Sequence, residues 1–194
     1  MMGFFATAAK GTEPALRDEL RELGLPEVRC DRGGVHFGGN WADAAWACLQ
    51  SRIAIRVLVE IGAFEAPDGE ALYEGTKALD WSPYLTPRHT LAVSVACRSS
   101  ALTHTNFIAQ KTKDAIVDQL RDRLGTRPDV ARKDPDVAIF VHLVRDRATV
   151  YLDAAGHSLH RRGYRLEAAQ APLKETLAAA ALRLGGWDRD SPLC

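Results

Sequence analysis

Hydrophobic residues in the first part of the chain alternate between the spacing of strands and the spacing of helices. Residues 4–8 form a short apolar stretch that is typical of a strand. Thr12 then offers a hydroxyl that we expect to cap a helix, and Gly24 is expected to end that helix. Leucines at helical spacing predict its buried face: Leu16, Leu20 and Leu23.

The next forty residues complete a recognisable order of elements. Residues 28–31 and 35–37 flank Gly33-Gly34, a pattern that predicts a hairpin. Asn40 is expected to cap a second helix, and residues 53–61 are expected to form a long strand. The apolar positions of that second helix are Ala45, Trp46 and Leu49. The order strand, helix, strand, strand, helix, strand predicts an α+β fold that begins with a ferredoxin-like βαββαβ unit.

A second unit of helices and strands is predicted from residue 68 onward. Residues 62–69 are expected to be the linker into it, and a helix follows through Leu79. Apolar residues in alternation predict a strand: Leu91, Val93, Val95 and Cys97. Residues at four-residue spacing predict an amphipathic helix over 105–124, ended by Gly125: Ile108, Thr112, Ile116, Leu120 and Leu124. Residues 137–143 and 148–152 alternate in period two, which predicts a hairpin with a charged tip at 145–147.

The last thirty residues predict the beginning of another domain. Residues 171–184 are dense in helix formers, Pro172 suits a first helical turn, and Gly185-Gly186 is a stop signal. No strand follows this helix before Cys194. We therefore expect residues 166–194 to be disordered or packed on a neighbouring molecule, with an apolar face exposed at Leu173, Leu177 and Leu182.

Composition indicates a soluble protein with a packed core, for which a cytoplasmic location is the expectation. The chain has 194 residues, is 46% hydrophobic and has a formal net charge of zero. It has neither a long apolar run nor a basic, hydrophobic start. Its cysteines are widely spaced and predict buried free thiols: Cys30, Cys48, Cys97 and Cys194. His157 and His160 lie three apart, but they have no nearby carboxylate or thiol, so no metal site is predicted.

Motifs for catalysis are absent from the chain, and the positive signals are those of nucleic-acid binding. There is no phosphate loop, dinucleotide-binding glycine pattern or nucleophile elbow, so no catalytic residue is assigned. The stretch from Arg98 to Arg147 carries ten basic and seven acidic residues. The candidate RNA-binding residues are the cations that could contact phosphates: Arg98, Lys111, Lys113, Arg145, Arg147, Arg161, Arg162 and Arg165.

Structural roles are the alternative for both groups of cations. Asp114, Asp118 and Asp122 are spaced to form ion pairs with the cations of the 105–124 helix, which would then be a solvated face. Tyr164 could stack on a base between the arginines of 161–165, or it could be buried in an interdomain linker. The sequence alone leaves open whether these cations have structural or RNA-binding roles.

Several blocks of the sequence resemble the bacterial THUMP-domain RNA methyltransferases. They are residues 5–11, 32–37, 111–118, 135–136, 159–165 and 171–180. Within that family the chain is most similar to the large-subunit ribosomal RNA guanine-N2 methyltransferases. The resemblance is collinear and covers essentially the whole chain, and the block from Gly163-Tyr-Arg to Pro172-Leu-Lys-Glu is specific.

The resemblance implies an RNA-binding portion of an enzyme that uses S-adenosylmethionine. It implies a ferredoxin-like domain at 1–65, a THUMP domain at 66–155, a linker at 156–165 and the truncated start of a Rossmann-like methyltransferase domain at 166–194. The cofactor loop and the motif that positions the guanine amine would follow Cys194, so this chain by itself is expected to be inactive and to bind no cofactor. Its expected partners are structured RNA, either rRNA or tRNA, and the remaining methyltransferase domain, with no membrane.

Two other functions are compatible with the same elements. One is the RNA-binding front of a THUMP-bearing thiouridine synthetase, which would need an ATP-binding loop downstream. The other is a non-catalytic adaptor that ends naturally at Cys194.

Overall fold

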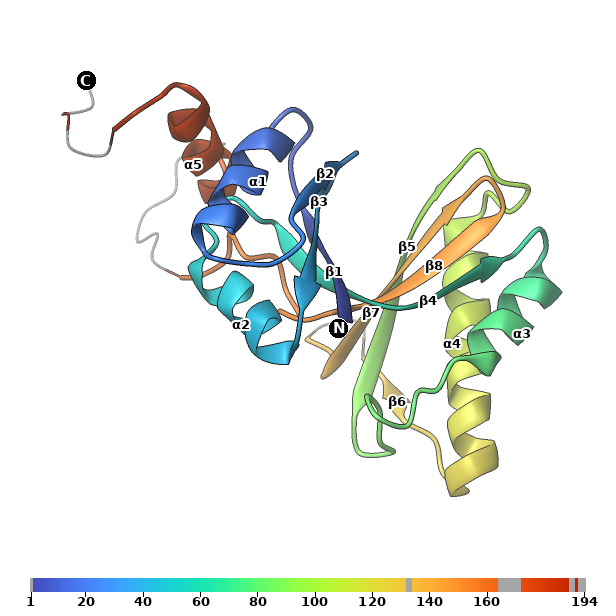
Figure 1. Cartoon of the computed structure of the whole chain (residues 1–194). Helices are drawn as coiled ribbons and strands as arrows, with labels where there is room; N and C mark the ends of the chain where they lie inside the picture. The colour runs from blue at the N-terminus through green and yellow to red at the C-terminus, as the bar shows by residue number, and fades with distance from the viewer. Residues whose placement is uncertain (1, 132–133, 164–171, 189–190, 192–194) are drawn as a thin grey trace. The chain divides into compact units, whose positions relative to one another are not determined.

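A computed structural model describes residues 2–131, 134–163, 172–188 and 191 (Figure 1). The chain divides into two compact units. The first contains residues up to Val59 together with those from His157 onward, and the second contains Glu60–Gly156.

The first unit has the ferredoxin-like order that the sequence predicts. Its elements are β1 (Met2–Thr7), α1 (Glu13–Glu22), β2 (Arg29–Asp31), β3 (Gly34–Gly39), α2 (Trp41–Gln50) and the start of β4 (Arg56–Glu65). The strands lie in the order β2-β3-β1-β4, and each neighbouring pair is antiparallel. Both helices lie on one side of this sheet (Figure 1).

Alternation along β1 decides which side chains form the core of the first unit. Phe4 and Ala6 are buried, and Phe4 lies opposite Phe37 of β3 with ring centroids 5.1 Å apart. Phe5 points to the other face, where the centroid of its ring lies 4.7 Å from the centroid of the His36 ring. Leu16 and Leu20 of α1 cover the buried face of the sheet, because a helix presents residues four apart on one side.

A buried carboxylate joins α1 to the segment between α2 and β4. Glu19 accepts hydrogen bonds from the Ser51 hydroxyl at 2.5 Å and from the amides of Arg52 at 3.0 Å and Ile53 at 3.2 Å. These donors satisfy an anion that would otherwise be costly to bury. Nothing in the local sequence pattern predicts this contact.

The second unit is a mixed sheet with two helices. It contains the end of β4, then α3 (Gly69–Ala78), β5 (Thr90–Arg98), α4 (Thr105–Leu124), β6 (Asp129–Val130), β7 (Val137–Val144) and β8 (Arg147–Asp153). The strand order is β4-β8-β7-β5-β6; β5 is parallel to β6 and β7, whereas β7 and β8 form an antiparallel hairpin. The crossover through α4 returns the chain to the same end of the sheet, as parallel pairing requires.

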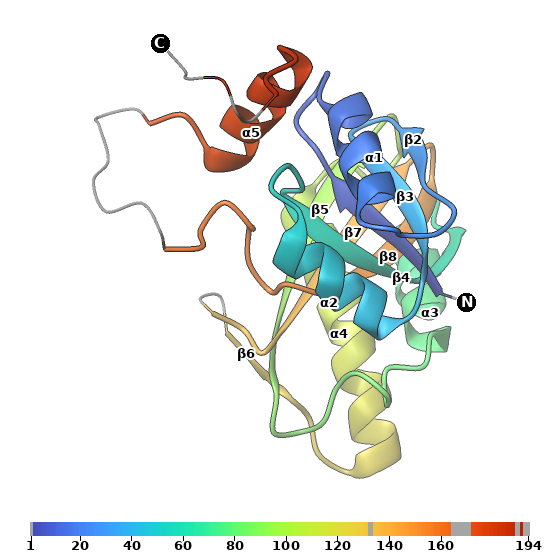
Figure 2. The same cartoon turned by 60° about the vertical axis from the view of Figure 1, so that its left-hand side comes forward.

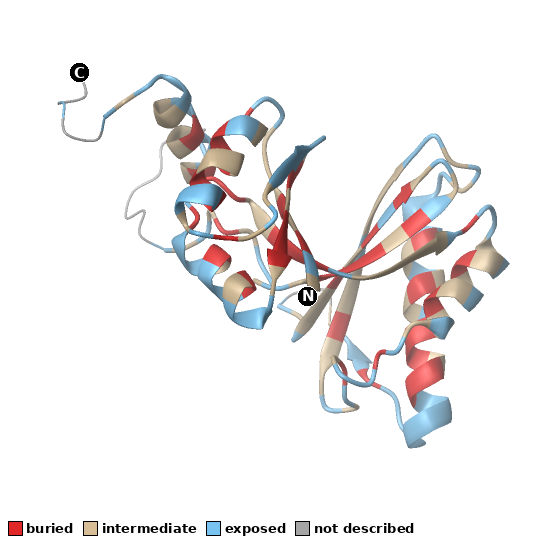
Figure 3. Cartoon of the chain, in the orientation of Figure 1, coloured by how far each residue is buried: buried red, intermediate tan, exposed pale blue. Residues whose placement is uncertain are grey.

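The amphipathic stripe of α4 faces the core as predicted, except at its last residue. Ile108, Thr112, Ile116 and Leu120 are buried, whereas Leu124 is exposed (Figure 3). The helix ends at Gly125, whose backbone is left-handed with φ of 72°. Glycine adopts this conformation without steric cost, which explains why it ends the helix there.

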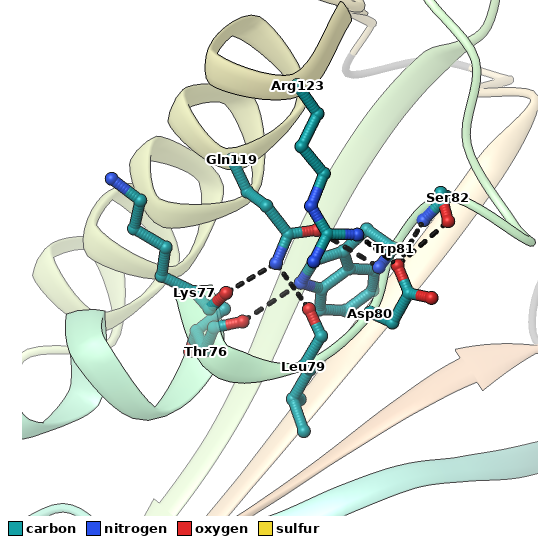
Figure 4. A network of polar contacts seen from close by, with 8 residues as sticks. All are labelled: Thr76, Lys77, Leu79, Asp80, Trp81, Ser82, Gln119 and Arg123. Atoms are coloured by element: carbon teal, nitrogen blue, oxygen red, sulfur yellow. Dashed lines mark hydrogen bonds and ion pairs between the residues drawn. The ribbon is translucent and has the colours of Figure 1, made fainter.

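A polar network connects the end of α3 to α4 (Figure 4). The Gln119 side chain donates to the carbonyls of Lys77 and Leu79 and accepts from the amide of Trp81 at 3.1 Å. The indole of Trp81, which is fully buried, donates to the Thr76 carbonyl at 2.9 Å. This network satisfies the backbone groups that the end of α3 leaves without helical partners.

Several local predictions were wrong, each for a reason visible in the structure. The Thr12 hydroxyl does not cap α1; it donates to the Ala9 carbonyl at 2.8 Å. Residues 62–65 are not a linker, because β4 continues through Glu65 and Arg147 of β8 pairs with that residue at 3.2 Å. Cys30 is exposed, and Cys48 and Cys97 are half-buried, so these described thiols are not core residues.

The large apolar side chains of α2 point away from the core, contrary to the prediction. Asn40 does cap it, with a capping box that includes Asp43. Its buried positions, however, are Ala44 and Ala47, whereas Trp46 and Leu49 are exposed. The small side chains allow α2 to approach the sheet closely and leave the large ones outside.

The last helix, α5 (Glu175–Leu184), is formed and belongs to the first unit. It lies beside α1 (Figures 1 and 2). Arg183 of α5 forms a forked ion pair with Glu22 of α1. The prediction that this segment is disordered or packed on a neighbouring molecule is therefore wrong for residues 175–184. Leu177 is exposed as expected, whereas Leu182 is half-buried. Pro172 precedes the helix instead of occupying its first turn.

Candidate nucleic-acid interface

Three of the predicted RNA-binding arginines meet at one end of the sheet in the second unit. Arg98 ends β5 and lies opposite Val144, which in turn lies opposite Arg147. The amide of Arg145 donates to the Arg98 carbonyl at 3.3 Å. The β7–β8 turn thus carries Arg145 beside the end of β5, and Arg147, at the start of β8, lies at the same end of the sheet with β7 between it and β5.

The turn itself is held by its acidic residue. Arg145 and Asp146 both have positive φ, of 52° and 61°, which suits a two-residue hairpin turn. The Asp146 carboxylate accepts from the Ala101 amide at 2.7 Å, and the Asp146 amide donates to the Ser100 hydroxyl at 3.0 Å. Asp146 is therefore engaged with the backbone of the following loop, and Arg145 is exposed beside it.

Charge at this end of the sheet is only partly compensated. Arg147 pairs with Glu65. Arg98 and Arg145 form no ion pair among the described residues, and both are exposed. We name Arg98, Arg145 and Arg147 the β5-end cluster.

Lys111 and Lys113 lie elsewhere in the second unit, at a cleft beside α4. The cleft has a volume of about 570 Å³, and its lining includes Tyr73 of α3 and Arg127, which precedes β6. The ammonium of Lys111 lies 5.8 Å from the centroid of the Tyr73 ring, as in a cation–π contact. Lys113 is paired with Asp114 at 2.7 Å.

The carboxylates of α4 pair with several cations in and near this cleft, although Lys111 and Arg127 form no ion pair among the described residues. Asp118 pairs with Arg121 at 2.8 Å and also accepts from the Tyr73 hydroxyl at 2.8 Å. That hydrogen bond raises the pKa of Tyr73. Asp122 pairs with Lys77 at 2.9 Å, which lowers the pKa of Asp122 and raises that of Lys77. These pairs are those of a solvated, charge-balanced helix, which was the structural alternative for the α4 cations.

Arg162 is held in the first unit and is not available as a free cation. Its guanidinium donates to the carbonyls at the end of α2, to Cys48 at 2.7 Å, Leu49 at 2.9 Å and Ser51 at 2.7 Å. Its Nε donates to the Leu159 carbonyl at 3.0 Å. The arginine thus caps the carboxyl end of a helix, where a cation is favoured by the helix dipole.

The segment around Arg162 is attached to the first unit by further contacts. Leu159 is buried, and its amide donates to the Ile55 carbonyl at 2.8 Å. Arg161 is exposed, and its side chain makes no ion pair among the described residues. Tyr164 and Arg165, the remaining candidates of this segment, lie outside the described residues.

The structure therefore separates the predicted site into three groups. It brings together the β5-end cluster, it places Lys111 and Lys113 at the α4 cleft, and it assigns Arg162 to a helix cap. Tyr73 and Arg127 were missed by the sequence reasoning. No local signal marks them, because the cleft exists only where α3, α4 and the chain before β6 meet.

The described part of the chain offers no group of side chains for a metal ion and no membrane-spanning helix. Over residues 2–131, 134–163, 172–188 and 191, no group of three or more His, Cys, Asp or Glu residues could hold a metal ion. His160 lies 2.7 Å from the Ser158 hydroxyl. None of the described helices is long and apolar enough to cross a membrane.

Three domain families match successive parts of the chain. Residues 3–58 match the RlmL ferredoxin-like domain, residues 66–153 match the THUMP domain, and residues 162–194 match the RMKL-like methyltransferase domain. Together these matches cover most of the chain.

Similar proteins carry names that agree with these domains. A ribosomal RNA large subunit methyltransferase K/L of Methylococcus capsulatus is 51% identical over 95% of this chain, and one of Syntrophotalea carbinolica is 48% identical over 95%. The chain spans about a quarter of the length of these relatives, 25% and 26% respectively. A protein classed as a methyltransferase and crystallised with SAH is 36% identical and superposes with a TM-score of 0.86, over 98% of this chain and 50% of that one.

Proposed function

We propose that the chain is the RNA-binding portion of a THUMP-bearing ribosomal RNA methyltransferase of the K/L type, the family to which its three successive domain matches and its relatives point. It positions structured RNA for methyl transfer by the methyltransferase domain of the same polypeptide. The observation that carries this proposal is the collinear similarity to the K/L relatives at 51% and 48% identity. We infer rRNA as the substrate in preference to tRNA, since the names of those relatives specify rRNA, and a cytoplasmic location follows from such a substrate.

The domain limits form part of this proposal. We infer a ferredoxin-like domain at 1–65, a THUMP domain at 66–155, a linker at 156–165 and the start of the methyltransferase domain at 166–194. The relatives described above carry methyltransferase names and give no support to the thiouridine synthetase or adaptor alternatives.

S-adenosylmethionine supplies the methyl group in this family, but no contact with it is assigned to the described residues. The part of the methyltransferase domain that the structure describes is one helix, α5, followed by Gly185-Gly186. A glycine-rich cofactor loop follows a strand and opens a helix. These glycines end a helix instead, so this segment does not fit the cofactor.

The β5-end cluster supports the RNA-binding role most directly. Arg98 and Arg145 are exposed and form no ion pair among the described residues, whereas Lys113 and Arg121 of α4 are paired with Asp114 and Asp118. Lys111 lies over the ring of Tyr73. A phosphate that binds at Arg98 and Arg145 does not have to displace a carboxylate, whereas Arg147 is paired with Glu65. We infer that Arg98 and Arg145 contact the RNA backbone and that Lys111 and Lys113 contribute less.

Binding measurements on charge-neutralised variants test this function. The chain should bind a structured fragment of large-subunit rRNA, and the logarithm of its affinity should fall linearly with the logarithm of salt concentration. Arg98→Gln with Arg145→Gln should weaken binding roughly tenfold and reduce the salt slope by about two. Fluorescence anisotropy over a salt series measures both quantities, with tRNA as the competing substrate.

Arg88→Gln is the matched control. Arg88 is exposed and lies just before β5, at the opposite end of the strand from Arg98. It should leave affinity and salt slope unchanged. Equal effects of the control and the double variant would overturn the assigned surface, and absence of RNA binding by the unaltered chain would overturn the function.

A further inference from the structure

The exposed side of α2 is apolar along its whole length. Trp41, Trp46 and Leu49 are 47%, 45% and 67% exposed, and Ala42 and Ala45 are exposed between them. Gln50 is the one polar residue among the exposed positions of this helix. We name this surface, formed by Trp41, Ala42, Ala45, Trp46 and Leu49, the α2 outer face.

We propose that the α2 outer face is the docking surface for the methyltransferase domain of the same polypeptide, an inference that rests on the proposed function. Large aromatic and aliphatic side chains on one helix face are typical of a surface that becomes covered. The inward positions Ala44 and Ala47 show that α2 already packs on the sheet without using its large side chains. The apolar residues on the other side are thus not needed for the core of the first unit.

Contacts at the carboxyl end of α2 connect this surface to the start of the methyltransferase match. Arg162 is the first residue of that match, and its guanidinium is bound to the carbonyl of Leu49, itself part of the α2 outer face. The chain therefore enters the methyltransferase domain at the edge of the surface.

A second point of attachment lies at the end of α1. Arg183, inside the matched region, pairs with Glu22, the last residue of α1. The indole of Trp46 donates at 3.3 Å to the carbonyl of Leu23, the residue that follows Glu22. The end of α1 thus contacts both α5 and the α2 outer face, so the surface continues an interface that α5 has already begun.

Charge argues against RNA as the occupant of the same surface. The α2 outer face contains no lysine or arginine, and nucleic-acid binding depends on cations that neutralise phosphates. A second copy of the chain is the other occupant that the test must separate.

Hydrogen exchange of α2 tests the docking. The amides of residues 41–50 are compared between the 194-residue chain and the polypeptide extended through the whole methyltransferase domain. Burial of a leucine side chain such as that of Leu49 favours the docked state about tenfold or more. The amides of α2 should therefore exchange at least about tenfold more slowly in the longer polypeptide. Leu49→Gln, and independently Ala45→Gln, should abolish the added protection while leaving the melting temperature of the 194-residue chain unchanged.

Leu124→Gln is the matched control, because Leu124 is an exposed leucine in the last turn of α4, in the second unit. It should leave the protection of α2 intact. Equal exchange of α2 in both polypeptides, or protection that survives both α2 variants, would overturn the docking. So would a dimer of the 194-residue chain that Leu49→Gln dissociates, or a loss of RNA affinity in that variant. RNA binding and methyl transfer by the unaltered long polypeptide report separately on the proposed function.

Discussion

At the scale of the residue, Glu13 joins the start of α1 to the β2–β3 hairpin. Its carboxylate accepts from the amides of Gly11 at 2.7 Å and Gly33 at 3.1 Å. Hydrogen bonds from backbone amides, its own first and then those of Gly33 and Gly11, lower the pKa of Glu13. The carboxylate therefore ties the segment before α1 to the β2–β3 hairpin, a contact different from the cap that the Thr12 hydroxyl was expected to provide.

The stability of the chain should depend on pH through this group. A lowered pKa in the folded state means that the contribution of Glu13 is present above its unfolded value, about 4.3, and is lost as pH falls through the folded value. Glu13→Gln should lower the free energy of unfolding by about 1 kcal/mol at pH 7, and the difference should shrink towards pH 3. Urea denaturation at a series of pH values measures it; a difference that grows on acidification would contradict the assignment.

Thr112 is a buried polar group in α4. Its side chain is fully buried, and its hydroxyl makes no hydrogen bond to any residue that the structure describes. Thr112→Val removes the unsatisfied hydroxyl and keeps the shape, so it should raise the free energy of unfolding by about 1 kcal/mol. Thr112→Ser, which keeps the hydroxyl and loses a methyl group, should lower it, and thermal denaturation distinguishes the two variants.

At the scale of the element, α2 depends on a residue more than a hundred positions away. Arg162→Ala leaves the last carbonyls of α2 without their donor and should lower the free energy of unfolding by about 2 kcal/mol. Arg162→Lys should recover little, because a single ammonium lacks the planar fork that reaches several carbonyls. Chemical denaturation measures these changes, with Arg161→Ala as the exposed neighbour that should have no effect.

RNA affinity provides the complementary measurement for the same variants. Since the guanidinium of Arg162 is occupied by carbonyls, Arg162→Lys should not change RNA binding, contrary to the expectation from sequence. A loss of affinity in Arg162→Lys without a loss of stability would return this residue to the RNA-binding surface.

At the scale of the whole molecule, the proposed function predicts that RNA binding can be separated from methyl transfer. Its described methyltransferase segment is a single helix without a cofactor loop, so the 194-residue chain should bind RNA but transfer no methyl group. Incubation with tritiated S-adenosylmethionine and rRNA fragments checks this, under conditions in which anisotropy shows the RNA to be bound. Label incorporated into RNA by this chain alone would contradict it.

Much of the fold could be predicted from the sequence, and much less of the candidate site. The 105–124 helix, its end at Gly125, the Asn40 cap and the β7–β8 hairpin were all predicted and confirmed. Of the candidate cations, Arg162 donates to the carbonyls at the end of α2, a contact that the sequence did not indicate. Lys111 and Lys113 are placed at a cleft with Tyr73 and Arg127, which the sequence did not indicate.

The sequence by itself determined the order of the elements, their limits where caps and glycines mark them, and the α+β fold. These features depend on interactions between residues a few positions apart, which a linear pattern records. Only the tertiary structure decided that the tryptophans of α2 face outward, that Glu19 is buried under three donors and that Arg162 caps a helix. The contacts of Glu19 and Arg162 join residues more than thirty positions apart, and the outward face of α2 depends on how the helix packs on the sheet. A local pattern cannot specify which of several available partners a side chain will meet.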